Sequence, residues 1–185
     1  MSISHPLARA VCFTLLLCCV VFSACGERKA DLDNPNHYSA HGMAFDYPGN
    51  WKVTDDQDMG GGVYFITIES PGNALVMVHR MPDLVALDIR AFGEELAKNT
   101  QKEMPIGEAS PSRFGAVKTL GMYEAMKEEF VISLLNQRVP HLRTYYRRVD
   151  SGVSWYITTQ VSKEDVKAVQ KGFELVVRSF RIQSG

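Results

Sequence analysis

The stretch VPHLRTYYRRVDSGVSWYITTQV, residues 139–161, decides the fold class. Two runs rich in β-branched and aromatic residues flank Asp150-Ser151-Gly152, which is the pattern of two strands joined by a tight turn. The preceding run MYEAMKEEFVISLL, residues 122–135, fits either a helix or a strand. We predict a strand there, because three successive strands joined by short turns form an antiparallel meander.

Further strands are predicted toward the N-terminus. VYFITIE (63–69) and ALVMVHR (74–80) are β-rich runs, and the turn sequence of residues 70–73 between them indicates a hairpin. Alternating residues 43–47 predict a half-buried strand. Residues 55–62, DDQDMGGG, are predicted to form a loop.

Two helices are predicted by apolar residues at helical spacing. The first begins at the N-cap Asp88 and ends near Lys102, and the second begins at the N-cap Ser162 and ends near Arg178. Their apolar stripes are Ile89, Phe92, Leu96 and Thr100 in the first, and Val166, Val169, Phe173, Val176 and Val177 in the second. The order of elements predicts an α+β fold in which helices cover an antiparallel sheet.

The composition of the 185-residue chain is that of an ordinary globular protein. The net charge is −1, 22% of the residues are charged and 45% are hydrophobic. All four cysteines lie within the first 25 residues. The remaining chain is therefore compatible with an oxidising compartment, because it contains no thiol that could mispair.

The N-terminal segment has the pattern of an export signal. Residues 10–24 form an apolar run of about fifteen residues after Arg9, which is shorter than the roughly 20 that a spanning helix needs. The sequence Phe22-Ser23-Ala24-Cys25 resembles the bacterial lipobox, although the usual leucine is replaced by Phe22. The resemblance implies removal of residues 1–24 and acylation of Cys25. A plainly secreted protein and an uncleaved anchor remain the alternatives.

The domain organisation follows from this interpretation. We predict a lipoprotein signal peptide over residues 1–24, a flexible tether over 25–41 and one globular domain over 42–185. The expected location is the cell envelope. By analogy with the lipoproteins that the lipobox resembles, Gly26 rather than Asp after the cysteine favours the outer membrane, facing the periplasm, if the host has one.

Two stretches resemble a known superfamily. FDYPGNWKV (45–53) is similar to the F-x-Y-P-x-x-W start of the PsbP-like superfamily, and FELVVRSFRI (173–182) resembles its ending. The resemblance, to domains of the DcrB and LpqN type, implies an α/β/α sandwich around an antiparallel sheet. It also implies accessory and partner-binding roles rather than catalysis.

One strand carries the best candidate for a partner surface. In RTYYRRV, Arg143, Tyr145 and Arg147 share one face, and arginine and tyrosine are typical anchors of protein interfaces. The alternative is an ordinary amphipathic strand with packed arginine stems. A nucleic-acid partner is not expected for an exported protein. Trp51, Trp155 and Tyr156 are expected in the core.

Other motifs predict no metal, cofactor or catalytic site. An EF-type calcium loop beginning at Asp56 would require ligands at Gly60 and Thr67, which neither residue supplies. The histidines of the mature chain lie in the expected tether (His37, His41) or on different strands (His79, His141). No G-x-S-x-G turn is present, and the domain contains no cysteine nucleophile.

Three functional hypotheses remain open at this point. The first is a membrane-tethered, non-enzymatic binding or assembly module that docks an envelope protein. The second is a lipoprotein that binds a small ligand or metal ion in a pocket between sheet and helix. The third, and the least favoured, is an envelope hydrolase.

Overall fold

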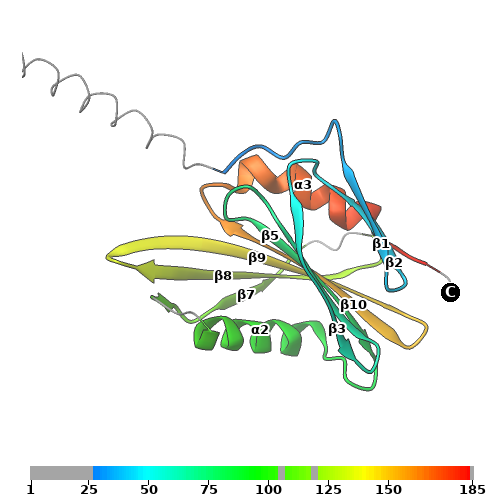
Figure 1. Ribbon diagram of the computed structural model, residues 1–185. Coiled ribbons are helices and arrows are strands. Elements are labelled where there is room, and N and C mark those ends of the chain that lie inside the picture. The colour runs from blue at the N-terminus through cyan, green and yellow to red at the C-terminus, as the bar shows by residue number, and fades with distance from the viewer. Residues whose placement is uncertain (1–26, 104–106, 118–120, 184–185) are drawn as a thin grey trace, which may run out of the picture.

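The structure is a computed structural model that describes residues 27–103, 107–117 and 121–183 (Figure 1). The predicted signal peptide and Cys25 lie outside these residues. Within the described ranges, no helix has both the length and the apolar character needed to cross a membrane.

The main sheet is antiparallel throughout and contains the predicted meander. Its strand order is β3-β4-β5-β10-β9-β8-β6, and β7 also pairs with β8. The hairpin across residues 151–152 pairs Asp150 with Val153, which confirms the predicted turn. The strands are β3 (Lys52–Gly60), β4 (Val63–Glu69), β5 (Leu75–Pro82), β6 (Glu108–Ala109), β7 (Arg113–Ala116), β8 (Glu124–Leu134), β9 (Gln137–Asp150) and β10 (Val153–Ser162).

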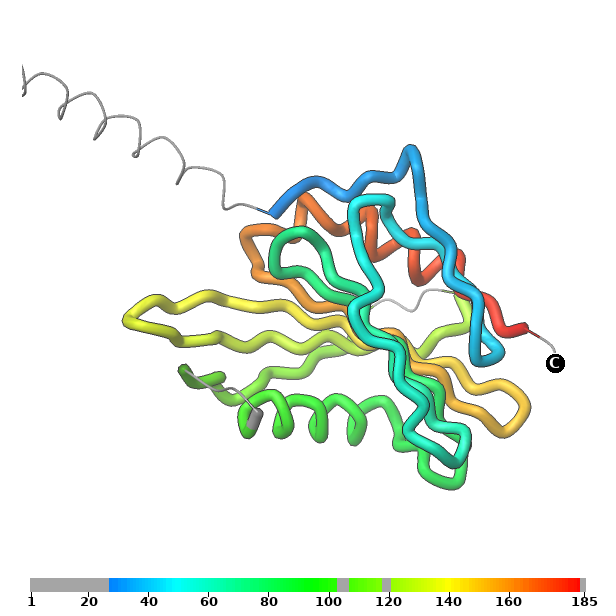
Figure 2. The backbone as a smooth tube through the Cα atoms, in the orientation of Figure 1, coloured from blue at the N-terminus to red at the C-terminus, as the bar shows by residue number. Residues whose placement is uncertain are grey.

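Two layers cover the sheet (Figures 1 and 2). Helix α2 (Ile89–Glu103) lies against one face. Helix α3 (Val166–Ser179) covers the other face together with a small sheet of β1 (Asn36–Ala40), β2 (Met43–Tyr47) and β11 (Arg181–Ile182). This arrangement is the predicted α+β sandwich.

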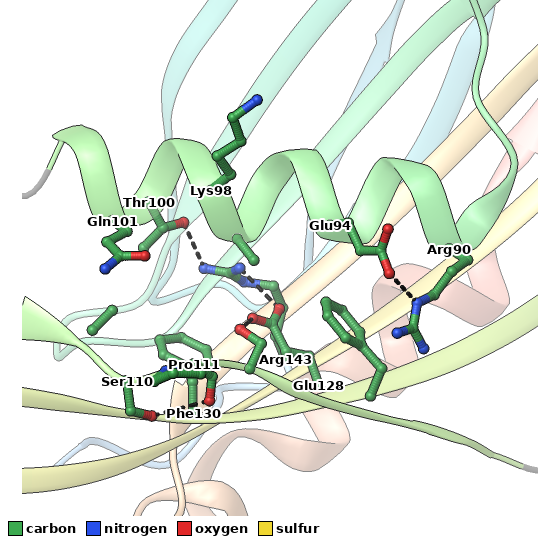
Figure 3. Close-up of a pocket in the computed structure, with 14 residues that line it drawn as sticks. Arg90, Glu94, Lys98, Thr100, Gln101, Ser110, Pro111, Glu128, Phe130 and Arg143 are labelled. Atoms are coloured by element: carbon green, nitrogen blue, oxygen red, sulfur yellow. Dashed lines mark hydrogen bonds and ion pairs between the residues drawn. The ribbon is translucent and has the colours of Figure 1, made fainter.

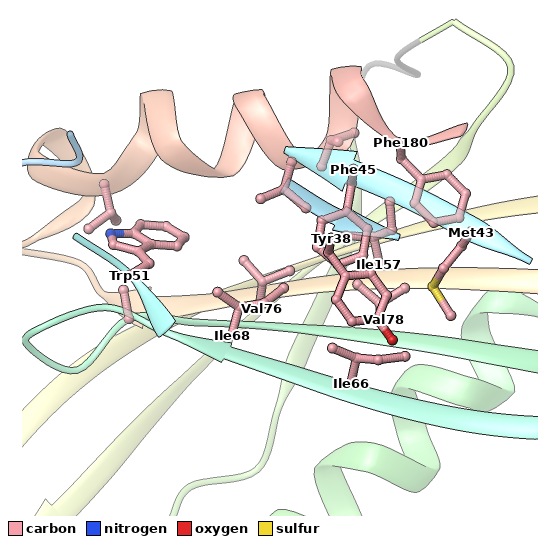
Figure 4. Close-up of a cluster of buried hydrophobic side chains, with 14 of the residues drawn as sticks. Tyr38, Met43, Phe45, Trp51, Ile66, Ile68, Val76, Val78, Ile157 and Phe180 are labelled. Carbon is pink, nitrogen blue, oxygen red and sulfur yellow. The ribbon is translucent and has the colours of Figure 1, made fainter. Parts of the chain in front are cut away.

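The larger hydrophobic core lies between the main sheet and the α3 layer (Figure 4). Alternating residues of β4 and β5 supply Ile66, Ile68, Val76 and Val78, all fully buried. Trp51 packs edge-on against Phe173 of α3, and Trp155 packs edge-on against Phe180. The predicted core positions of both tryptophans are therefore confirmed.

The N-terminal segment is not the flexible tether that we predicted. Strand β1 pairs with β2 over its whole length, and Tyr38 stacks on Phe45 with 4.8 Å between ring centroids. Upstream of β1, Ala30 is buried and its amide donates to the carbonyl of Ala168. The turn residues Asp33-Asn34-Pro35 precede β1, and His41 and Gly42 form the β1–β2 turn.

Two further predictions need correction. Residues 55–60 belong to strand β3, because an edge strand can expose polar residues while its backbone pairs with β4. Helix α3 begins at Val166 rather than next to Ser162, whose hydroxyl donates to Asp165 within the preceding turn. The other predicted cap is confirmed, because Asp88 accepts a hydrogen bond from the amide of Ala91.

Candidate binding site

Helix α2 lies against the sheet through the predicted apolar stripe. Phe92 stacks on Tyr156, with ring centroids 4.0 Å apart, and meets Tyr145 edge-on. Gly93 allows this close approach, since a Cβ atom there would lie 2.6 Å from the terminal methyl of Met126. The helix is thereby held over β8, β9 and β10.

A buried ion pair lies beneath α2. Arg143 Nη1 donates to Glu128 Oε2 over 2.9 Å, and the two side chains are 2% and 1% exposed. The Tyr145 hydroxyl donates to the same carboxylate, whose other oxygen accepts from Ser112. Burial is the main cause that raises the pKa of Tyr145, so this phenol remains protonated and acts as a donor.

The guanidinium of Arg143 is saturated by protein acceptors. Its Nε donates to Gln160 over 2.8 Å, and its Nη2 donates to Thr100 on α2 over 3.0 Å. The group also lies over the ring of Phe130. Because every nitrogen has an acceptor, the network joins α2 to the sheet and leaves no free donor for an anionic ligand.

These positions correct the predicted partner surface. The face shared by Arg143, Tyr145 and Arg147 exists, but α2 covers it, so Arg143 and Tyr145 are buried rather than exposed. Arg147 is half-buried beyond the end of the network, where it donates to Glu124 and Ser154. Glu128 was not identified from the sequence as the partner of Arg143. Glu128 lies opposite Arg143 in the β8–β9 hairpin, so the pairing of these two strands would have indicated the ion pair.

Two hollows flank this network. The first, of about 330 Å³, lies between α2 and the segment around β6 and β7 (Figure 3). Its wall is charged and polar, with the ion pair of Arg90 and Glu94 at one end and Lys98 and the neutral Gln101 toward the other.

The second hollow is an apolar groove on the uncovered part of the same sheet face. It has a volume of about 760 Å³ and runs beside α2 across β3, β4 and β5. Arg143 and Gln160 contribute to its floor together with Thr100. The apolar lining consists of Met59, Val63, Phe65, Leu75, Met77, Met81, Leu96 and Ile132.

Solved structures provide the relevant comparison. The chain is similar to cyanobacterial PsbP (CyanoP) from Synechocystis sp. PCC 6803, with a TM-score of 0.51 and 15% sequence identity over 87% of this chain and 98% of that one. The fold is PsbP-like.

A second similar structure is LpqN, involved in cell envelope biogenesis of Mycobacterium tuberculosis. It matches with a TM-score of 0.41 and 13% identity, over 82% of this chain and 90% of that one. No protein-family model matches the chain, and no curated protein matches it in sequence.

The PsbP-like domain places its four histidines apart. His37 and His41 each contact a different carboxylate, of Asp46 and Asp56 respectively, at 2.6 and 2.9 Å. Over the described parts of the chain, no group of three or more potential metal-binding side chains is assembled.

The other two histidines lie within the PsbP-like sheet. His141 stacks on Phe130, and burial lowers its pKa. His79 lies in the wall of the groove between Phe65 and Phe92, and its Nδ1 atom is buried without a hydrogen-bond partner. Burial lowers the pKa of His79 to about 4, so the groove carries a neutral imidazole at pH 7.

Proposed function

We propose that this protein is a lipid-anchored, non-enzymatic binding module of the cell envelope. The apolar run that ends at Cys25 supports export and acylation of that residue. Several acyl chains on one residue make a lasting membrane anchor, whereas a single chain is marginal.

The groove beside α2 is the observation that carries the binding role. Its lining is mostly apolar, while the polar groups of Arg143, Gln160 and Thr100 are already bonded to one another. A site of this kind selects shape and apolar surface rather than charge.

The occupant that we propose is an extended apolar segment of an envelope protein. Strand β3 borders the groove and is an edge strand, with β4 as its neighbour among the described residues. An extended peptide can pair with such an edge and direct alternate side chains into the adjacent groove. Half-buried Asp55 and exposed Asp58 on β3 favour a segment that also carries lysine or arginine.

A small apolar ligand is the second candidate, because about 760 Å³ lies within the range of about 300–1,000 Å³ that ligand pockets occupy. Titration of the purified domain with an apolar fluorescent probe distinguishes the two. Saturable binding that is lost in Met77→Asp would favour the small ligand.

Site-specific photo-crosslinking in intact cells tests the proposed partner. A photoreactive residue at Met59 or Phe65 should link to an apolar segment of an envelope protein, and mass spectrometry identifies that segment. The same residue at the exposed Val149 is the control. Binding of the purified partner should then be lost in Met77→Asp, whereas identical adducts from Val149 would contradict the proposed site.

The anchor is tested separately by intact mass. Protein extracted from membranes should begin at residue 25 and carry acyl mass, which the Cys25→Ser variant should lack. An unmodified chain in the soluble fraction would overturn the anchored part of the proposal.

A further inference from the structure

The β8–β9 hairpin extends far beyond the β4–β5 turn at one end of the main sheet, and β6 pairs with it as far as Ser133. Leu75 pairs with Gln160, and Gln160 pairs with Arg143, so the β4–β5 and β8–β9 turns lie at the same end. Strand β9 extends from that row by six more residues to Gln137, or about 20 Å at strand spacing. Figure 2 shows this hairpin, in yellow, projecting on the side where the blue N-terminal segment begins.

The tip of the hairpin has an apolar side chain that folding does not explain. Leu135 is 86% exposed, and the adjacent Leu134 is also exposed. Leu135 and Asn136 have φ angles of 46° and 66°. Two-residue hairpin turns of this kind favour Asn-Gly, whereas a leucine with positive φ is strained. The leucine therefore adds strain to the turn without contributing packing.

The chain entry is fixed at the same end of the sheet. Glu27 Oε2 accepts hydrogen bonds from the Ser70 hydroxyl and from the amides of Asn73 and Ala74, at 2.8, 2.8 and 3.1 Å. Cys25 precedes Glu27 by two residues, which span at most about 7 Å. An acyl anchor on Cys25 therefore lies close to the β4–β5 turn.

We infer that the β8–β9 tip inserts Leu134 and Leu135 into the bilayer that holds the acylated Cys25. This inference rests on the proposed lipid anchor. Apolar side chains at such a site enter about 5–10 Å into the boundary between headgroups and acyl chains. The lipid surface is the favoured occupant because the anchor holds this end of the domain beside it.

An exposed leucine at the opposite end provides a matched control. Leu84 is 97% exposed in the loop after β5. The neighbouring amide of Asp83 donates to the carbonyl of Gly152 in the β9–β10 turn, which places this loop at the end away from Glu27. Leu84 therefore lies at the end of the sheet away from Glu27.

Depth-dependent fluorescence quenching tests the insertion. Acylated full-length Leu135→Trp and Leu84→Trp are reconstituted into vesicles of phosphatidylethanolamine and phosphatidylglycerol, with and without brominated acyl chains. The native Trp51 and Trp155 are buried and contribute the same background to both variants. We expect a blue shift and bromine quenching for Leu135→Trp, and neither for Leu84→Trp.

The outcomes separate the insertion from the anchor. Co-sedimentation with vesicles and intact mass report on the anchor, whereas quenching reports on the tip. An acylated, sedimenting Leu135→Trp chain without quenching would overturn the insertion and leave the anchor in place; a protein partner for the tip would then be sought. Wild-type protein that is neither acylated nor sedimented would overturn both.

Discussion

Arg143 and Glu128 form an ion pair that spans β9 and β8 and is enclosed by α2. Their nitrogen and oxygen atoms are 2.9 Å apart, and Thr100 and Gln160 hold the guanidinium from two other elements. Two charges in such a place require full hydrogen bonding to offset their lost hydration. The pair therefore specifies how α2 sits on the sheet.

Removal of one partner should destabilise the fold strongly. Arg143→Met or Glu128→Leu should each lower the free energy of unfolding by about 3–5 kcal/mol, because the remaining charge is buried and uncompensated. The double variant should lose less than the sum of the two. Urea denaturation of the four proteins in this cycle measures the difference.

The exposed pair Arg90–Glu94 on α2 is the control for that cycle. Its coupling should be only about 0.3–0.5 kcal/mol. Equal couplings for the buried and the exposed pair would contradict the structural role of Arg143.

The N-terminal boundary can be tested by truncation. A chain that starts at residue 42 lacks β1 and removes Tyr38 from the ring of Phe45. Loss of a buried aromatic residue costs about 3–5 kcal/mol, so this chain should be less stable than one starting at residue 27 by at least that amount. Thermal unfolding of the two chains checks this difference. Equal melting temperatures would support the prediction from the sequence that the segment before residue 42 is a flexible tether.

The contact between α3 and the chain around Trp51 depends on Gly172. A Cβ atom there would lie 2.8 Å from both Pro48 Cγ and Trp51 Cζ2. Alanine normally favours a helix by about 1 kcal/mol over glycine, but overpacking costs about 1–3 kcal/mol. Gly172→Ala should therefore show no net stabilisation and should shift the near-UV circular dichroism of Trp51. Lys171→Ala, at an exposed neighbour, should leave that signal unchanged.

His79 should make stability depend on pH. Its folded pKa of about 4 lies below its ordinary value of 6.5, so the unfolded chain binds more protons between these values. The free energy of unfolding should fall as pH decreases from about 6.5 to about 4, by up to ~1.4 kcal/mol per pH unit for this group.

Denaturation at several pH values checks this dependence. His79→Gln should reduce the slope, and the residual slope includes His141, whose pKa is lowered in the same direction. His37→Gln removes an exposed imidazole and serves as the control. An unchanged slope in His79→Gln would show that this ring ionises freely in the folded protein.

Periodicity predicted the elements whose residues alternate between two environments. The stripe of α2 follows from its helical spacing, whereas strands β8, β9 and β10 follow from β-branched and aromatic runs joined by short turns. Strand β10 shows no alternation, because it is buried on both faces. Strand β3 was not predicted, because the exposed polar residues Asp56, Gln57 and Asp58 are typical of a loop. Only the pairing with β4 shows that they belong to a strand. Backbone pairing at an edge leaves little trace in side-chain pattern.

The candidate site was predicted only in part. Alternation placed Arg143 and Tyr145 on one face, but it could not show that a helix 40 residues earlier covers them. Pairing β8 with β9 across residues 135–136 sets Glu128 opposite Arg143, which indicates a buried ion pair. The groove exists because α2 covers only part of the sheet face. How much of the face a helix covers is a property of the tertiary structure, so it could not be predicted from local sequence patterns.

For the proposed acylated protein, the hydrogen bonds of Glu27 also limit the distance between the domain and the membrane. A free tether of residues 25–41 would have a root-mean-square length of about 23 Å. With Glu27 clasped to the β4–β5 turn, only about 7 Å of chain separates it from Cys25. An acylated protein would then stay close to the surface of the bilayer that holds its acyl chains. Partners embedded in that membrane or bound to its surface would be within reach of the domain.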